Sequence, residues 1–143
     1  MLNAQIYLYF DGQAEEAAEF YRQALDAEVS GLTRFRDGPE QLKEMYPVCD
    51  ADKVTYLKVK IGEQTLLFCD GLCAGQPHFT GFSIALAVPD VAAAERLFAL
   101  LGAGGKVKFA LEQTYFSPAY GMLADRFGVE WIIQADQVES LEL

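Results

Sequence analysis

The sequence predicts an α+β fold made of two similar halves, each with the order strand, helix, strand, strand, strand. Residues 4–10 and 82–88 alternate between apolar residues and others, which is the period of a β-strand. Each run is followed by a helical stripe of apolar residues, over 13–25 and 90–101. A single shift along the chain superposes the two stripes, as Ala14 on Val91, Ala17 on Ala94, Phe20 on Leu97, Tyr21 on Phe98 and Ala24 on Leu101.

Local signals define the elements of the first half. Asp11-Gly12 ends the first strand, and strand alternation is clearest over 54–61. The turn Gly62-Glu63-Gln64 then produces a hairpin. Residues 37–52 are rich in polar and turn residues and predict a long loop, with a short helical turn at 40–46; such loops often bind ligands. The predicted order is strand 4–10, helix 13–25, strand 27–35, strand 54–61 and strand 65–69.

The second half follows a connector, residues 70–80, that contains Gly and Pro. Pro89 ends the ladder of the next strand, and Asp90 is well placed to cap a helix. The pair Gly104-Gly105 stops that helix. Asp125-Arg126-Phe127-Gly128 predicts a tight turn, with Asp125 as a turn residue and not an acid catalyst. The predicted order is strand 82–88, helix 90–101, strand 106–110, strand 119–124 and strand 129–134.

Each predicted strand has two chemically different faces. The apolar faces should pack against the helices; they carry Ile6, Leu8, Phe10, Leu57, Val59, Ile61, Phe82, Ile84, Leu86 and Val88. The opposite faces mix aromatic, polar and small residues, which is typical of a ligand pocket. The alternative interpretation is that these faces are simply half-exposed to solvent or form a dimer contact. The residues that we expect to face a ligand are Gln5, Tyr7, Tyr56, Lys58, Ser83 and Ile132, with Tyr9 on the same face as Tyr7.

Length and composition bound the class of protein. The 143 residues predict a single domain, residues 1–143, with a first module at about 1–75 and a second at about 76–143. The hydrophobic fraction of 52% excludes disorder. No apolar run approaches the roughly 18 residues that span a bilayer, and the amino terminus has no signal-peptide pattern. We therefore expect a cytoplasmic protein.

The formal net charge of −10 argues against nucleic acid and anionic membranes as partners. No cluster of Lys and Arg offsets this charge locally, and high negative charge also serves solubility. The three cysteines, Cys49, Cys69 and Cys73, are an odd number without a framework spacing, which fits a reduced intracellular protein. Their pattern assigns them no function.

Several stretches resemble one family. They are Tyr7-Leu8-Tyr9-Phe10-Asp11-Gly12 with Glu16-Ala17 and Phe20-Tyr21, Gly104-Gly105-Lys106-Val107, and the closing run Tyr120-Gly121-Met122-Leu123-Ala124-Asp125-Arg126-Phe127-Gly128-Val129-Glu130-Trp131. They are similar to PhnB-like members of the vicinal-oxygen-chelate superfamily, which includes glyoxalases and bleomycin-resistance proteins. The resemblance implies paired βαβββ modules whose sheets curve into a half-barrel around one cavity, with the helices on the outer face. It also suggests an aromatic wall at Tyr115 and Phe116, where relatives tend to read Thr-Phe-Trp-Gly.

The resemblance further implies a divalent metal, because active superfamily enzymes hold one with His, Gln or Glu side chains from four strands. The corresponding positions here are Gln5, Tyr56, Ser83 and Ile132. PhnB-like relatives usually carry a histidine at the position of Tyr56, and Ile132 has no ligating atom. The sole histidine, His78, lies in the connector. The sequence therefore predicts a cavity without a metal or other cofactor, although a divalent metal stays an alternative.

These features favour a binding protein, without catalysis, that holds a small hydrophobic or aromatic molecule. The alternatives are a metal-dependent lyase, isomerase or dioxygenase of the vicinal-oxygen-chelate type, and a dimeric interaction module with a filled cavity. A nucleophilic triad is not supported, since one histidine in a loop is its only candidate base. No glycine-rich cofactor loop follows a strand, so the sequence does not indicate a methyltransferase. A homodimer is expected in every case, because curved module sheets have free edges.

Overall fold

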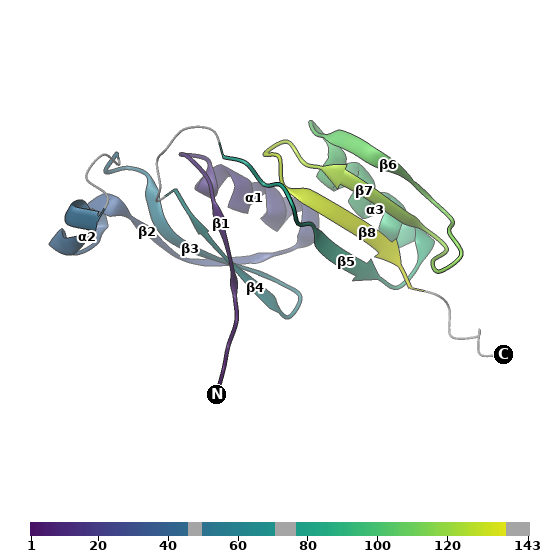
Figure 1. Cartoon of the computed structure of the whole chain (residues 1–143), viewed down its shortest axis with the longest axis horizontal. Coiled ribbons are helices and arrows are strands. Elements are labelled where there is room, and N and C mark those ends of the chain that lie inside the picture. Colours follow the sequence, from purple (N-terminus) through teal and green to yellow (C-terminus); the bar gives the residue numbers. More distant parts are fainter. Residues whose placement is uncertain (46–49, 71–76, 137–143) are drawn as a thin grey trace. The chain divides into compact units, whose positions relative to one another are not determined.

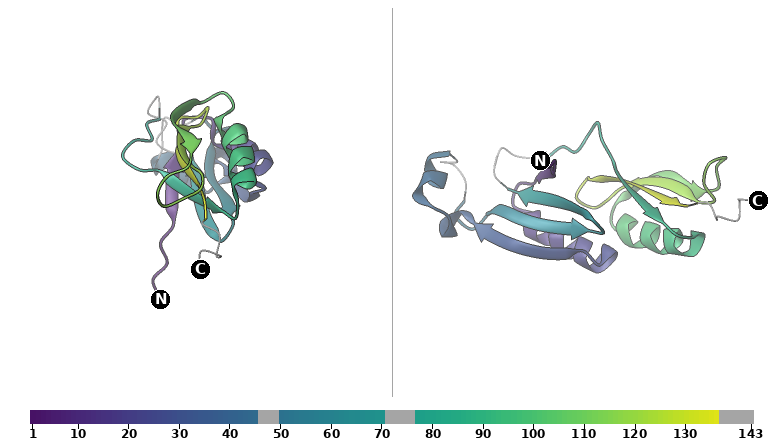
Figure 2. Two further views of the ribbon diagram at one scale, coloured as in Figure 1. Left: turned by 90° about the vertical axis from the view of Figure 1, so that its right-hand side faces the viewer. Right: turned by 90° about the horizontal axis from the view of Figure 1, so that it is seen from below.

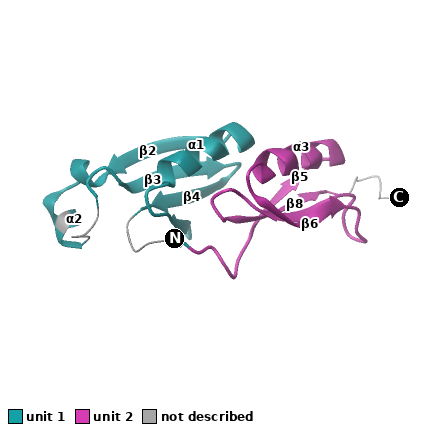
Figure 3. Ribbon diagram, turned by 90° about the horizontal axis from the view of Figure 1, so that it is seen from above, with its two compact units in different colours: residues 1–77 teal, residues 78–143 magenta. Residues whose placement is uncertain are grey.

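The computed structural model describes residues 1–45, 50–70 and 77–136. The chain divides into two compact units, Met1–Pro77 and His78–Leu143 (Figure 3). Each unit contains a four-stranded sheet with a long helix against one of its faces, as Figures 1 and 2 show. No helix within the described ranges is long and apolar enough to cross a membrane.

The first unit contains all elements up to the connector. They are β1 (Ile6–Tyr9), α1 (Ala14–Leu25), β2 (Glu28–Arg34), the 3-10 turn η1 (Phe35–Asp37), α2 (Glu40–Met45), β3 (Val54–Ile61) and β4 (Gln64–Cys69). The strand order is β1-β4-β3-β2. β1 runs parallel to β4, and the other neighbours are antiparallel. A short first strand therefore lies beside the last one, with the helix as the crossover connection.

The second unit repeats this plan. Its elements are β5 (Ile84–Val88), α3 (Val91–Gly102), β6 (Lys106–Glu112), β7 (Tyr120–Ala124) and β8 (Glu130–Ala135), in the sheet order β5-β8-β7-β6. The parallel pair is again the first strand with the last. The predicted α+β class and the order strand, helix, strand, strand, strand are thereby confirmed in both halves. The sheets are open and separate, and one curved half-barrel formed by both stays a prediction.

Element boundaries agree with the sequence patterns to within a few residues. The strand predicted at 54–61 is β3 without change, and the helical turn predicted at 40–46 is α2, whose described part ends at Met45. The strand predicted at 82–88 begins later, at Ile84, so Ser83 precedes β5. Gln5 likewise precedes β1. Cys49 and Cys73 lie outside the described residues.

The core of the first unit lies between α1 and one face of its sheet. Leu57 and Val59 are fully buried there, as predicted from their alternation. The ring centroids of Tyr21 from α1 and Phe68 from β4 are 5.8 Å apart at a nearly perpendicular angle of 82°. Edge-to-face packing of this kind is a favourable aromatic geometry. The helix thus covers the apolar face and leaves the opposite face of the sheet for other contacts.

Two of the apolar side chains expected to pack against a helix are exposed, although the register keeps Ile6 on the same face as the buried Leu66 and Val59. Ile6 is 43% exposed and Phe82 is 38% exposed. Ile6 is the first residue of β1, and Phe82 precedes β5; both strands are at the edge of their sheets. A side chain at the start of an edge strand has few neighbours to cover it, so alternation alone does not bury it.

The core of the second unit lies between α3 and its sheet. Trp131 and Ile133 of β8 and Leu101 of α3 are fully buried. The Asp125 carboxylate accepts hydrogen bonds from the backbone N–H groups of Phe127 (2.8 Å) and Val129 (3.1 Å) and from the Trp131 indole Nε1 (2.8 Å). The prediction of Asp125 as a turn residue is confirmed, and this residue also anchors the core tryptophan.

The two long helices begin in different ways. Asp90 caps α3 by accepting a hydrogen bond from the Ala93 N–H at 2.8 Å. Gln13 precedes α1 and makes no such bond. The Asp70 carboxylate, from the residue after β4, instead accepts from the Ala14 N–H at 3.2 Å. A carboxylate distant in sequence thus accepts the hydrogen bond of the first N–H group of α1. Its negative charge also interacts favourably with the positive end of the helix dipole.

Asp90→Ala is expected to lower the free energy of unfolding by about 1 kcal/mol, because the first turn of α3 loses its cap. Urea unfolding followed by the fluorescence of Trp131, the single tryptophan, would measure this effect in the second unit. Gln13→Ala is the control and should leave the unfolding midpoint unchanged. An equal loss in both variants would contradict the capping role of Asp90.

Candidate functional site

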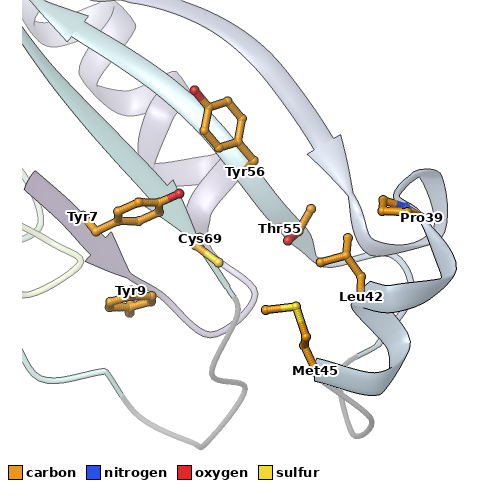
Figure 4. Close-up of a pocket in the computed structure, with 8 residues that line it drawn as sticks. All are labelled: Tyr7, Tyr9, Pro39, Leu42, Met45, Thr55, Tyr56 and Cys69. Atoms are coloured by element: carbon orange, nitrogen blue, oxygen red, sulfur yellow. The ribbon is translucent and has the colours of Figure 1, made fainter. Parts of the chain in front are cut away.

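A pocket of about 450 Å³ opens on the face of the first sheet that α1 does not cover. We call it the tyrosine pocket. Figure 4 shows the eight residues that line it, from β1, β3, β4 and the segment that contains α2: Tyr7, Tyr9, Pro39, Leu42, Met45, Thr55, Tyr56 and Cys69.

Two tyrosines of β1 form one wall. Tyr7 and Tyr9 are two residues apart, so the strand period places both on the same face. Their rings stack in a nearly parallel arrangement, with centroids 5.7 Å apart and an angle of 11° between the planes. They are 42% and 44% exposed, so much of each ring is in contact with solvent. The pair therefore offers a broad aromatic surface to a molecule in the pocket.

The third tyrosine, Tyr56, lies across the pocket on β3 (Figure 4). Its ring packs over Gly31 of β2, where an added Cβ would be only 3.2 Å from Tyr56 Cε2. Gly31 also has a positive φ of 70°, within a register irregularity between Ser30 and Thr33. Two features therefore favour glycine at this position. They are the positive φ of the backbone and the close packing of the Tyr56 ring against it. The local bend of β2 positions the Tyr56 ring.

The opposite wall comes from the segment that was predicted to be a long binding loop. Pro39, Leu42 and Met45 contribute apolar side chains from the start and the end of α2. Gly38 lets Leu42 pack closely, because a Cβ there would be 2.2 Å from Leu42 Cδ1. Met45 remains 65% exposed, although it is large and apolar. Methionine is flexible and polarisable, so this wall can adapt to the shape of an aromatic ligand.

The chemistry of the tyrosine pocket is aromatic and apolar, with a few polar atoms. Its polar side-chain groups are three phenol hydroxyls, the Thr55 hydroxyl and the Cys69 thiol, and Cys69 is only 4% exposed. None of the lining residues is Asp, Glu, Lys, Arg or His. Such a lining can hold an uncharged ring and donate or accept hydrogen bonds at its edge.

The structure brings together some of the residues predicted to face a ligand. Tyr7 and Tyr56 both line the tyrosine pocket. Lys58 lies on the same strand and face as Tyr56, is exposed, and pairs in register with Leu67 and Ser30. Gln5 is exposed and precedes β1. None of these positions is part of the apolar core under α1.

The other four predicted ligand-facing residues belong to the second unit. Ile132 is half-buried on the face of β8 away from α3, where it pairs with Ala85 of β5, and Ser83 precedes β5. Ser83 Oγ is 3.4 Å from a carboxylate oxygen of Glu130, which also accepts a hydrogen bond from Lys108 Nζ. The aromatic pair stands apart in the loop after β6. Tyr115 is 94% exposed and packs edge-to-face against Phe116, with ring centroids 5.0 Å apart.

The four positions implied for a divalent metal do not fit one. Ile132 has no ligating atom, and the Ser83 hydroxyl is already close to Glu130. Within the described ranges, no group of three or more His, Cys, Asp or Glu side chains could hold a metal ion. We therefore derive no step that uses a metal, and the metal-free cavity stays a prediction.

Several residues that line the tyrosine pocket, or that contact a predicted ligand-facing residue, were not selected from the sequence. Tyr9 was placed on the same face as Tyr7 but was not chosen as a ligand-cavity residue. Glu130 could have been found, because it lies two residues before Ile132 and therefore on the same face of β8. Leu42 and Met45 carry no local signal, because only tertiary packing places α2 at the pocket. Cys69 was noted only as one of three cysteines.

Comparison with known proteins identifies relatives along nearly the whole chain. The family model described as 3-demethylubiquinone-9 3-methyltransferase matches residues 3–134. Protein YjdN of Escherichia coli (strain K12) is 26% identical over 133 residues, which cover 89% of this chain and 90% of YjdN. The match therefore includes both units.

Solved structures share this fold. The crystal structure of protein PA1353 from Pseudomonas aeruginosa matches with a TM-score of 0.84 at 33% identity, covering 96% of this chain and 100% of that one. A structure titled as a putative 3-demethylubiquinone-9 3-methyltransferase, PhnB protein, from Bacillus cereus matches with a TM-score of 0.77 at 22% identity. It covers 94% of this chain and 99% of its own. At that identity the likeness shows the fold alone.

Proposed function

Because the chain belongs to the family described as 3-demethylubiquinone-9 3-methyltransferase, the PhnB-like branch of the vicinal-oxygen-chelate superfamily, we propose that it binds a small molecule in the tyrosine pocket. The ligand is hydrophobic or aromatic, and binding does not involve catalysis. The observation that carries the proposal is the set of large apolar side chains left exposed around one hollow. Tyr7, Tyr9 and Met45 all line it and are 42%, 44% and 65% exposed.

Physical chemistry supports a ligand at this place. Soluble proteins seldom leave a group of large apolar side chains exposed around a concavity without a binding role. The volume of about 450 Å³ is within the range of sites that enclose small molecules. A ligand here would remove the tyrosine rings and the Met45 side chain from water, which is the main favourable term in such binding.

Methyl NMR of the methionines would test the proposal directly. The chain has three methionines, Met1, Met45 and Met122, so methyl-¹³C labelling gives three signals. Met45 lines the tyrosine pocket, Met122 lies on β7 of the second unit, and Met1 is fully exposed at the chain terminus. Small uncharged aromatic and aliphatic compounds would be titrated one at a time. We expect saturable shifts of the Met45 methyl and none at Met1.

The outcomes separate the alternatives. A shift at Met45 supports binding in the tyrosine pocket, and a further shift at Met122 would add the cavity shared by both modules that the sequence predicts. A shift at Met122 alone, or no shift across the compound set, would overturn the proposal. Variant Tyr9→Leu should weaken binding, whereas Tyr115→Leu, which changes an exposed tyrosine of the second unit, should leave it unchanged.

The proposal includes a cytoplasmic homodimer. Its support is that β1, β2, β5 and β6 are edge strands, whose outer backbone groups pair with no other described strand. Light scattering after size exclusion should give twice the chain mass of 15.8 kDa. A monomeric mass at micromolar concentration would overturn this part while leaving the ligand site untouched.

A further inference from the structure

We infer that the ligand of the tyrosine pocket carries an anionic group, such as a carboxylate, and that Lys58 binds this group while the aromatic part lies against Tyr7, Tyr9 and Tyr56. This inference rests on the proposed function. It narrows the ligand from a small aromatic molecule to an aromatic acid with a short arm between ring and charge.

The position of Lys58 follows from the register of the sheet. Tyr7 pairs with Leu67, and Leu67 pairs with Lys58, so Tyr7 and Lys58 belong to one row across β1, β4 and β3. Side chains in such a row point to the same face of the sheet. The neighbouring row contains Tyr9 with Cys69, both in the pocket lining. Lys58 therefore lies beside the pocket, on the ligand face.

The distance from the pocket also suits a short arm. Tyr56 and Lys58 are two residues apart on β3, which separates their side chains by about 7 Å along the strand. The Tyr7 ring points across the sheet with its hydroxyl toward the side of Tyr56, as Figure 4 shows.

The charge of Lys58 is not neutralised by a neighbour, unlike the charges of Lys53 and Lys108. Lys53 forms an ion pair with Asp11 at 2.6 Å, and this hydrogen bond raises the pKa of Lys53. Lys108 is paired with Glu130. Lys58 makes no ion pair with any residue that the structure describes. In a chain with a formal net charge of −10, a lysine on the ligand face without a carboxylate partner is well suited to an anion from outside.

The immediate neighbours of Lys58 support this assignment. The residues directly across from it are Ser30 on β2 and Leu67 on β4, and neither is charged. An acidic residue of this face, Glu28, lies directly across from Lys60, one row farther from Tyr56. Lys60 thus differs from Lys58 in having a carboxylate as its register partner, and it provides a matched control on the same strand and face.

The experiment compares two compounds that differ only in charge. 3-(2-Naphthyl)propanoate has a planar ring and a carboxylate on a short arm, and 3-(2-naphthyl)propanamide is its uncharged counterpart. Calorimetry at low salt should show the acid binding about fivefold more tightly than the amide. This ratio is the gain in affinity expected from one partly exposed ion pair. The negative net charge of the protein would by itself produce the opposite order, so this preference requires a local positive group.

Variants assign the preference to a residue. Lys58→Met should bind the acid no more tightly than the amide, while Lys60→Met should keep the preference of the wild type. Lys58 is exposed, so its replacement should leave folding intact, and the amide affinity reports on this directly. Raising the salt concentration should reduce the preference in wild type and in Lys60→Met.

Three results would overturn the inference. They are equal binding of acid and amide by the wild type, an unchanged preference in Lys58→Met, and no binding of either compound. In the first two cases a Met45 methyl shift with the amide would still support the proposed function. In the third case, the NMR titrations of the Met45 methyl with other compounds would test the proposed function independently.

Discussion

Asp70→Ala is expected to lower the free energy of unfolding of the first unit by about 4 kcal/mol. Asp70 is 1% exposed, and its carboxylate accepts hydrogen bonds from the backbone N–H groups of Gly12 (2.8 Å), Ala14 (3.2 Å) and Val54 (3.0 Å). These donors belong to the turn after β1, the start of α1 and the start of β3. Alanine would leave all three without this acceptor, and two of them are buried.

Urea unfolding followed by far-UV circular dichroism would measure the loss, and hydrogen exchange at the Val54 amide would locate it. Asp70→Asn keeps one acceptor oxygen in place and should cost about 2 kcal/mol. Asp37→Ala removes an exposed aspartate of η1 and should change stability by less than about 0.5 kcal/mol. Equal stability of Asp70→Ala and Asp37→Ala would show that the three hydrogen bonds do not stabilise the unit.

Gly105→Ala should destabilise the second unit by about 3 kcal/mol. A Cβ at Gly105 would lie 2.2 Å from the Ala124 carbonyl oxygen and 2.9 Å from the Asp125 Cα. Both contacts are with backbone, so no side-chain rotation can relieve them. The start of β6 would have to move away from the end of β7, and this movement would disturb the Asp125 turn that holds Trp131.

The nearby variant Gly102→Ala is the matched control. A Cβ at Gly102, in the last turn of α3, would lie 3.5 Å from Leu123 Cδ2, which is ordinary van der Waals contact. Alanine also favours a helix by up to about 1 kcal/mol over glycine, so Gly102→Ala should be neutral or stabilising. Unfolding followed by Trp131 fluorescence would compare the two. A Gly105→Ala midpoint at or above that of the wild type would contradict the steric argument.

The tyrosine pocket illustrates how far local patterns extend. Alternation on β1 and β3 put Tyr7, Tyr56 and Lys58 on the face away from the helix, and the structure agrees, because side-chain direction in a strand depends only on the parity of the position. Alternation could not show that Tyr9 and Tyr7 stack or that Gly31 makes room for Tyr56. Those facts depend on register and on an irregularity between neighbouring strands.

Helix capping likewise has one part that local sequence predicts and one part that only the tertiary structure shows. The cap of α3 was predictable, since Asp90 is adjacent in sequence to the N–H groups that it satisfies. The start of α1 was not, because its acceptor is Asp70, more than fifty residues later in the chain. The local sequence pattern placed Asp70 at the start of the connector and gave it no part in α1. Residues that act over long separations leave no periodic signal near the element that they support.

By itself, the sequence determined the α+β class, the repeated strand and helix order, and the face of each strand that meets a helix, because hydrophobic period, turn residues and caps act between near neighbours. Only the tertiary structure decided that α2 brings Leu42 and Met45 to the tyrosines, that Asp70 joins β4 to α1, and that Lys58 lies beside the pocket without a carboxylate across from it. Those relations join residues far apart in the chain, and they exist only once the strands have paired in register.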